Sequence, residues 1–292
     1  MTEQALRPRR SALYLPGANG RALEKAETLP TDALILDLED AVAPDAKADA
    51  RRRVCTVAAS GGYGSREVTI RVNGIGTQWH DDDLRAVAEA GPAAVVVPKI
   101  NSAADVHAIE RALEAGGAPD HTTIWAMLET PVAVLHAEEI TTASERLSVL
   151  VMGTNDLAKE LRAEHVPGRA PLLTGLSLAV LATRLAGKEI LDGVYNDVSD
   201  VDGFTAECRQ AKQFGFDGKT LIHPRQVDPC NNTFAPTDGE IALSREIIAA
   251  FEAARGEGRG VVTVHGRMIE NLHVEQAQRV LAVAEAIGAL TR

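Results

Sequence analysis

Cysteine, aromatic residues and long apolar runs are all scarce in this chain of 292 residues. The three cysteines, Cys55, Cys208 and Cys230, are odd in number and far apart, which argues against a disulfide framework or a cysteine-based metal site. No apolar run approaches the roughly 20 residues of a membrane span, and the first ten residues contain no apolar signal-peptide core. These absences favour a cytoplasmic protein with free thiols.

An excess of positive charge is also missing. The chain has 30 Lys and Arg against 41 Asp and Glu, a net charge of −11, which argues against a nucleic-acid-binding surface. A polyanionic ligand would need a local basic patch. Five basic residues near the first predicted strand could supply one, although each could equally belong to a solvated surface: Arg7, Arg9, Arg10, Arg21 and Lys25.

What the chain does have is a series of eight short apolar runs, most of them continuous rather than alternating, as strands buried on both faces are. Helical patterns separate these runs. Eight βα repeats of roughly 25–35 residues predict a (β/α)₈ TIM barrel rather than a doubly wound sheet. The predicted strands are 11–16, 33–40, 67–73, 93–100, 123–129, 147–152, 191–195 and 218–224.

The sequence predicts two parts. We expect residues 1–232 to form the catalytic barrel and residues 233–292 to form a C-terminal lid or oligomerisation segment. In the second part, helices at 238–255 and 274–288 flank a hairpin-like stretch. Their apolar faces predict a homo-oligomer, since a free arm would expose too much apolar surface.

Polar residues stand at nearly every predicted strand end, where a barrel places its active site. Among them, Glu129 and Asp156 follow neighbouring predicted strands, so their carboxylates should converge at one point. Mg²⁺ binds through one or two protein carboxylates together with water and substrate oxygens, so the pair predicts a magnesium site. The alternative is that both acids merely cap the following helices. The full set of polar strand ends is Pro16-Gly17, Asp37/Glu39/Asp40, Arg71/Asn73, Lys99, Glu129, Asn155/Asp156, Asn196/Asp197 and His223.

Arg71 lies at an apolar strand end, between Ile70 and Val72. A buried guanidinium there needs anionic partners. It suits a two-pronged grip on a substrate carboxylate or the stabilisation of an enolate oxygen. The alternative is a structural ion pair with Asp37 or Glu39.

Seven motifs in order along the chain resemble those of the citrate lyase β-subunit-like group of the HpcH/HpaI aldolase family, and the resemblance covers essentially the whole chain. It implies a Mg²⁺-dependent (β/α)₈ barrel that cleaves or forms C–C bonds in 3-hydroxyacyl thioesters. The motifs are Ser-Ala-Leu-Tyr-Leu-Pro-Gly-Ala-Asn, Leu-Ile-Leu-Asp-Leu-Glu-Asp-Ala-Val-Ala-Pro, Arg-Val-Asn-Gly, Val-Val-Pro-Lys-Ile, Met-Leu-Glu-Thr-Pro, Gly-Thr-Asn-Asp-Leu-Ala-Lys-Glu-Leu and Gly-Lys-Thr-Leu-Ile-His-Pro.

The resemblance also implies roles for single residues. Glu129 and Asp156 match the family's Mg²⁺ ligands, and Arg71 matches the arginine that contacts the substrate; we add Glu129 and Lys99 as substrate-binding residues. Related malyl-CoA lyases carry an acidic residue, usually Asp, on a lid that reaches a neighbouring subunit. Glu270 takes that place here, so we expect it to be catalytic.

The leading interpretation is a Mg²⁺-dependent C–C lyase that acts on malyl-CoA or citramalyl-CoA through an acyl-CoA enolate, with a small α-keto acid as partner. One alternative is a (3S)-malyl-CoA-type thioesterase on the same scaffold. Another is the β-subunit of a citrate lyase, which acts on a carrier-bound citryl thioester. The resemblance implies a trimer or a hexamer, and we expect neither nucleic acid nor membrane as a partner.

Overall fold

Eight parallel strands close into a barrel in the computed structural model, which describes residues 6–290. Each strand pairs with the next along the chain, and β1 pairs with β8. The predicted (β/α)₈ barrel is therefore confirmed. The strands are β1 Ser11–Pro16, β2 Ala33–Asp37, β3 Glu67–Arg71, β4 Ala94–Val97, β5 Thr123–Leu128, β6 Leu147–Met152, β7 Glu189–Asp192 and β8 Gly218–Leu221.

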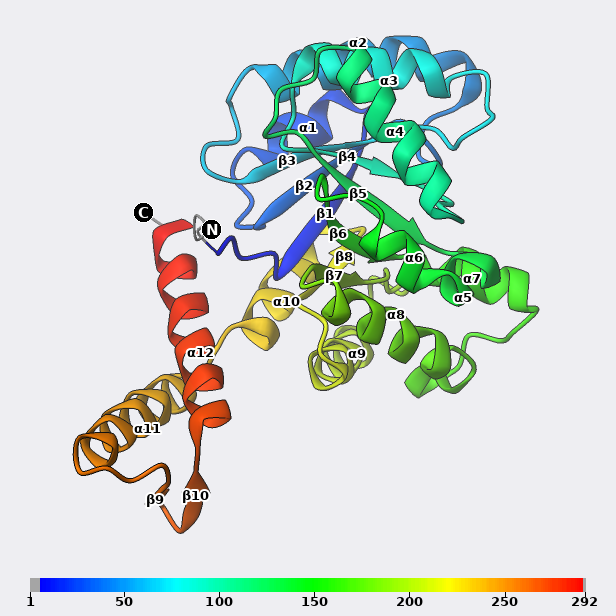
Figure 1. Cartoon of the computed structure of the whole chain (residues 1–292). Coiled ribbons are helices and arrows are strands. Elements are labelled where there is room, and N and C mark those ends of the chain that lie inside the picture. Colours follow the sequence, from blue (N-terminus) through cyan, green and yellow to red (C-terminus); the bar gives the residue numbers. More distant parts are fainter. Residues whose placement is uncertain (1–5, 291–292) are drawn as a thin grey trace. The chain divides into compact units, whose positions relative to one another are not determined.

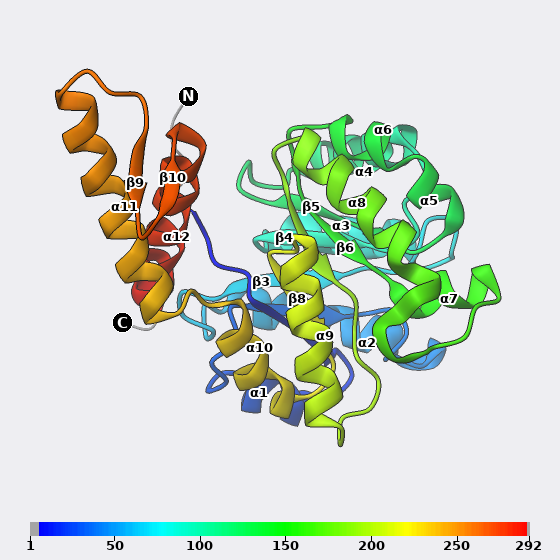
Figure 2. The same ribbon diagram turned by 90° about the horizontal axis from the view of Figure 1, so that it is seen from below.

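Helices surround the strands of this barrel on the outside (Figures 1 and 2). They are α1 Gly20–Ala26, α2 Lys47–Ala59, α3 His80–Ala90, α4 Ala103–Ala115, α5 Pro131–Leu135, α6 Ala137–Thr142, α7 Thr154–Leu161, α8 Leu173–Leu185, α9 Val201–Phe214 and α10 Val227–Phe234. Short 3₁₀ turns η1 Pro44–Ala46, η2 Pro167–Leu172 and η3 Pro224–Gln226 lie in the connections.

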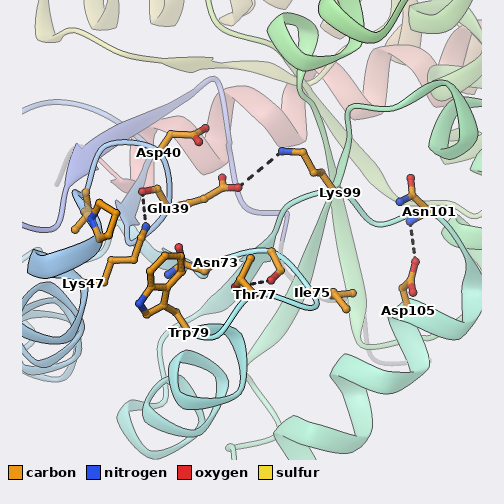
Figure 3. Close-up of a pocket in the computed structure, with 13 residues that line it drawn as sticks. Glu39, Asp40, Lys47, Asn73, Ile75, Thr77, Trp79, Lys99, Asn101 and Asp105 are labelled. Atoms are coloured by element: carbon orange, nitrogen blue, oxygen red, sulfur yellow. Dashed lines mark hydrogen bonds and ion pairs between the residues drawn. The ribbon is translucent and has the colours of Figure 1, made fainter.

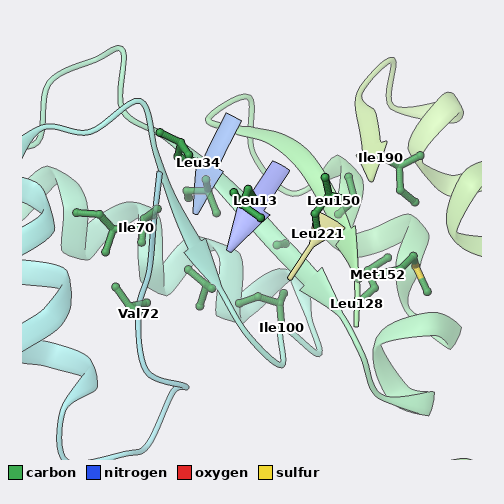
Figure 4. Packing of buried hydrophobic residues seen from close by; sticks show 14 of the residues in the cluster. Leu13, Leu34, Ile70, Val72, Ile100, Leu128, Leu150, Met152, Ile190 and Leu221 are labelled. Carbon is green, nitrogen blue, oxygen red and sulfur yellow. The ribbon is translucent and has the colours of Figure 1, made fainter. Parts of the chain in front are cut away.

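Most strand residues are apolar because both faces of each strand are buried. In β5, Trp125 and Met127 belong to a cluster inside the barrel, whereas Ile124, Ala126 and Leu128 belong to the cluster between barrel and helices. Figure 4 shows the outer cluster, to which several strands contribute leucine and isoleucine side chains. Residues that face the barrel interior alternate with residues that face the helices, but the sequence does not show this alternation because both faces require apolar side chains.

One predicted strand was misplaced. The run 191–195 was expected, but β7 is Glu189–Asp192. Both ends of this strand are acidic residues whose charges are paired in the fold, Glu189 with Arg9 and Asp192 with Lys219. An apolar pattern cannot reveal a strand whose polar ends are neutralised by distant residues.

The amino-terminal end of the barrel, which we call the floor, is closed by an arginine. Arg9 donates hydrogen bonds of 2.6 Å to Glu67 and to Glu189, the first residues of β3 and β7, and its guanidinium lies 5.6 Å from the centre of the Trp125 ring. Arg10 pairs with Asp32 just before β2. Neither arginine can therefore contribute to the basic patch that the sequence suggested for a polyanionic ligand.

The chain divides into two compact units, of which Arg9–Phe234 is the barrel. The other unit joins residues 6–8 to residues 235–290. Within it, α11 Asp238–Gly256 and α12 Asn271–Leu290 flank an antiparallel hairpin of β9 Val262–Val264 and β10 Arg267–Ile269. Phe251, Ile269 and Val274 form its own small core. No helix within residues 6–290 is long and apolar enough to cross a membrane.

Candidate functional site

The carboxyl ends of the strands surround a cavity of about 310 Å³, which we call the mouth cavity. Asp156 and Glu129, the predicted metal ligands, both line it, as does Arg71. Lys99 and Glu39 line a second cavity of about 680 Å³ beside it, and Asp40 lines both. The other residues of the mouth cavity are Tyr14, Asp37, Ala41, Met127, Met152, Gly153, Thr154, Asn155, Val194, Thr220 and Ile222.

Arg71 is held by a two-pronged ion pair. Its Nε and Nη2 each donate a 2.7 Å hydrogen bond to the Asp37 carboxylate, and Asp37 is its register partner on β2. The Tyr14 ring covers the guanidinium at 4.8 Å from the ring centre. Burial opposes the charged form of Arg71, but the carboxylate of Asp37 outweighs it and the pKa of Arg71 rises well above its ordinary value. The structural ion pair considered for Arg71 is thus present, and it aims the guanidinium into the mouth cavity.

Glu39 links Arg71 to Lys99. One of its oxygens lies 2.8 Å from Arg71 Nη1 and the other lies 3.9 Å from Lys99 Nζ. Burial is the main reason why the pKa of Glu39 rises to about 7, although Arg71 opposes the rise. Lys47 fixes the backbone of this segment, because its Nζ donates hydrogen bonds to the backbone oxygens of Leu38 and Glu39.

Glu129 is almost completely enclosed and is only 2 % exposed. Its Oε1 accepts a 2.8 Å hydrogen bond from the backbone N–H of Lys99. Burial, together with the nearby charges of Glu39 and Asp156, raises its pKa to about 7, although Lys99 pulls in the other direction. The positive charge of Lys99 therefore offsets the burial of this carboxylate only in part.

Gly153 allows Glu129 to occupy that place. A Cβ on Gly153 would lie 2.2 Å from Glu129 Oε2 and 2.3 Å from its Cβ, far inside any real contact. The backbone φ of Gly153 is −97°, so glycine is needed here for space rather than for its conformation.

The donor set fits Mg²⁺. Carboxylate oxygens are the hard ligands that this ion prefers, and it usually takes one or two of them and fills the remaining positions with water and substrate oxygens. Over residues 6–290 the structure gathers no group of three or more His, Cys, Asp or Glu side chains as a cation cage. Glu129 and Asp156 would therefore supply two ligands beside an open cavity, which is the arrangement of a catalytic rather than a structural ion.

Figure 3 shows the second cavity, with Glu39 and Lys99 in its lining. Trp79 forms part of its wall, with Lys47 Nζ 4.9 Å from the ring centre. Asn73, one of the predicted strand-end residues, also lines it, but its side chain and its backbone N–H both donate to Asp83. Asn73 therefore anchors the loop after β3.

Residues at three other predicted strand ends have local structural partners. The side-chain amides of Asn155 and Asn196 bond each other reciprocally, at 3.0 and 2.8 Å. His223 accepts the backbone N–H of Arg225 and caps η3.

Sequence reasoning missed a buried network of charged side chains on β7, β8, α9 and η2. Lys219, fully buried on β8, donates 2.7 Å hydrogen bonds to Asp192 and Glu207, and Arg169 also binds Asp192. The charges of Lys219 and Arg169 hold the pKa of Asp192 below its ordinary value despite burial. Lys219, a lysine inside the predicted strand 218–224, was the available signal.

Glu270, the predicted catalytic residue of the lid, belongs to the C-terminal unit and stands immediately before α12. Its backbone oxygen accepts the N–H of His273, and its own N–H donates to His273 Nδ1. His265, in the turn between β9 and β10, pairs with Glu246 at 2.7 Å. The catalytic role of Glu270 stays a prediction.

Replacing Gly153 with alanine should destroy the site while the barrel stays folded, because the new methyl group must displace Glu129. We expect Gly153→Ala to lose measurable Mg²⁺ binding by calorimetry, with a far-ultraviolet circular dichroism spectrum like that of the unchanged protein. Gly175→Ala is the matched control, since a Cβ there meets its nearest atom at 3.5 Å, an ordinary contact. Undiminished Mg²⁺ binding by Gly153→Ala would contradict this account of Glu129.

The raised pKa values predict how stability depends on pH. Folded, Glu39 and Glu129 hold protons up to about pH 7, whereas unfolded they release them near the ordinary value of 4.5. Between these values the folded state binds more protons, so the free energy of unfolding of the metal-free protein should fall as the pH rises. The melting temperature in a chelator should be lower at pH 8 than at pH 5.5, and Glu129→Gln should reduce that difference. Glu160→Gln, an exposed change on α7, should leave the difference unaltered; an equal slope in both variants would refute the argument.

Comparison with known proteins agrees with this geometry. The HpcH/HpaI aldolase/citrate lyase family model matches residues 10–224. The chain is 50% identical over 289 residues to a (3S)-malyl-CoA thioesterase of Cereibacter sphaeroides, and the match covers 99% of both chains. It is 38% identical over 293 residues to the citrate lyase subunit beta of Escherichia coli K12, and this match covers 99% of this chain and 97% of the other. The solved structure of CitE from Mycobacterium tuberculosis in complex with magnesium, acetoacetate and coenzyme A superposes with a TM-score of 0.78 at 28% identity, covering 94% of this chain and 97% of that one. The chain belongs to the HpcH/HpaI aldolase/citrate lyase family.

Proposed function

We propose that this protein is a Mg²⁺-dependent thioesterase that hydrolyses (3S)-malyl-CoA or a closely similar 3-hydroxyacyl-CoA. The observation that carries the proposal is the 50% identity, over 99% of both chains, with a (3S)-malyl-CoA thioesterase. The sequence alone favoured the lyase, and the comparisons support the alternative better.

The site supplies the groups that this reaction needs. Glu129 and Asp156 hold the metal, which when bound supplies positive charge for substrate oxygens. Arg71, aimed by Asp37, faces the mouth cavity and binds the negative charge of the substrate or of the developing oxyanion. Water adds to the thioester carbonyl carbon, the C–S bond breaks, and the CoA thiolate takes up a proton. The products are malate and free CoA.

The second candidate is the C–C lyase. It is favoured by the 38% identity with a citrate lyase β-subunit and by the M. tuberculosis structures, whose ligands are magnesium with acetoacetate, pyruvate or oxaloacetate. The same carboxylates and Arg71 would serve an acyl-CoA enolate and an α-keto acid. A carrier-bound thioester as substrate is a variant of this candidate.

We expect the purified chain, with (3S)-malyl-CoA and Mg²⁺, to release malate and free CoA in equal amounts without glyoxylate. Glu129→Ala and Asp156→Ala should abolish the release, because each removes a metal ligand. Glu160→Ala, on the same helix as Asp156 but exposed, should keep full activity. Glyoxylate with acetyl-CoA would identify a lyase, and an absence of turnover until a carrier protein is added would identify a citrate lyase subunit.

Glu270 extends the proposal to an oligomer. We assign to its carboxylate the transfer of a proton in the reaction, and we expect the protein to assemble as a trimer or a hexamer in the cytoplasm. The C-terminal unit exposes Met268 by 63 % and Leu272 by 48 % beside Glu270, which supports a subunit contact there.

Subunit mixing tests this arrangement. Glu270→Gln and Arg71→Ala should each be slow alone, and exchange of their subunits should restore part of the activity if Glu270 serves a neighbouring barrel. Mixing Glu129→Ala with Asp156→Ala is the control and should restore nothing, since both ligands belong to one barrel. If Glu270→Gln works at the unchanged rate, Glu270 has no catalytic role; if it is slow without recovery on exchange, it acts within its own chain.

A further inference from the structure

Lys99 places one ammonium among three carboxylates from three different strand ends. Its Nζ lies 3.9 Å from Glu39, 3.8 Å from Glu129 and 3.7 Å from Asp156. All three distances are longer than a direct hydrogen bond, so the ammonium lies between the carboxylates rather than against one of them. Figure 3 shows the side chain reaching across from the loop after β4 toward Glu39.

The backbone of Lys99 is held in an unusual conformation that favours this placement. Its φ of 53° is in the left-handed region, which costs a non-glycine residue on the order of 1 kcal/mol or more. In this conformation its N–H donates to the same Glu129 oxygen that the ammonium approaches, at 2.8 Å. Lys99 thus approaches Glu129 with both its backbone N–H and its side-chain ammonium.

The ammonium and a metal ion cannot share these carboxylates closely. Two of the three are the proposed Mg²⁺ ligands, and a bound ion would bring a double positive charge to about 2.0–2.1 Å from their oxygens. Positive charges only a few ångströms apart in a partly buried site repel strongly. One of the two cations must therefore move away.

The side chain of Lys99 has room to move. It is 42% exposed, its four-carbon stem is flexible, and it lines the 680 Å³ cavity rather than the mouth cavity. It can leave the carboxylates without disturbing the hydrogen bond of its own N–H to Glu129.

We infer that Lys99 is a built-in counter-cation of the metal site: it neutralises the carboxylates when the site holds no metal, and Mg²⁺ displaces its ammonium into the 680 Å³ cavity. This inference rests on the proposed magnesium site. Lys99 then stabilises the metal-free protein and weakens Mg²⁺ binding, because its ammonium competes with the ion for the carboxylates.

Calorimetric Mg²⁺ titration of the full chain without substrate tests the inference. Lys99→Met should bind Mg²⁺ about tenfold more tightly or better, because a unit charge within a few ångströms of the ion is removed. Its melting temperature should be lower than that of the unchanged protein in a chelator and should rise more on addition of Mg²⁺. Lys99→Arg keeps the charge and should keep the weaker binding.

Lys159→Met is the matched control, since Lys159 is an exposed lysine on the helix that carries Asp156, and it should change Mg²⁺ affinity much less. Should Lys99→Met fold poorly, Lys99→Gly removes the same charge at a backbone angle that suits glycine. If the unchanged protein binds Mg²⁺ and hydrolyses malyl-CoA, unchanged or weaker Mg²⁺ binding by the neutral variants overturns this inference and leaves the proposed function intact. If the unchanged protein binds no Mg²⁺, the proposed metal site fails with it.

Discussion

The pair of Asp37 and Arg71 is the interaction on which the mouth of this barrel depends. Each residue ends its strand, and the two are partners in the register of β2 and β3. Both are almost completely buried, so the loss of either would leave an uncompensated charge in the protein interior. Because Asp37 occupies two donors of the guanidinium, the third nitrogen is directed to Glu39. The orientation of Glu39, and through it the contact with Lys99, follows from this pair.

Around that pair the mouth accumulates more negative charge than it neutralises. Glu39 and Glu129 both have raised pKa values because they are buried near other carboxylates. The structure tolerates this cost at the place where a cation and an anionic substrate would meet, which is how functional sites commonly differ from structural ion pairs. Elsewhere in the barrel unit, buried charges such as Lys219 and Asp192 are fully paired with each other.

Much of the fold was predictable because repeated apolar runs have one main physical explanation, a parallel sheet buried on both faces. The meeting of Glu129 and Asp156 at one cavity was predictable because a barrel collects its strand ends at one edge. Three features were not. β7 was misplaced because its acidic ends are paired with residues far along the chain. Lys99 was expected only to contact the substrate, since its left-handed backbone leaves no trace in composition. The interior network of Lys219 was overlooked because a lysine in an apolar run does not reveal its partners.

The two arginines that precede β1 have a mechanical consequence. Arg9 and Arg10 are successive residues at the start of the barrel unit, and each is tied by short ion pairs to acids at the floor, on or beside β2, β3 and β7. The residues directly before β1 are therefore tied to three other strands of the barrel. The far end of β1 carries Tyr14, which covers Arg71. β1 is thus fixed by ion pairs where it begins and packs against Arg71 through Tyr14 nearer its other end.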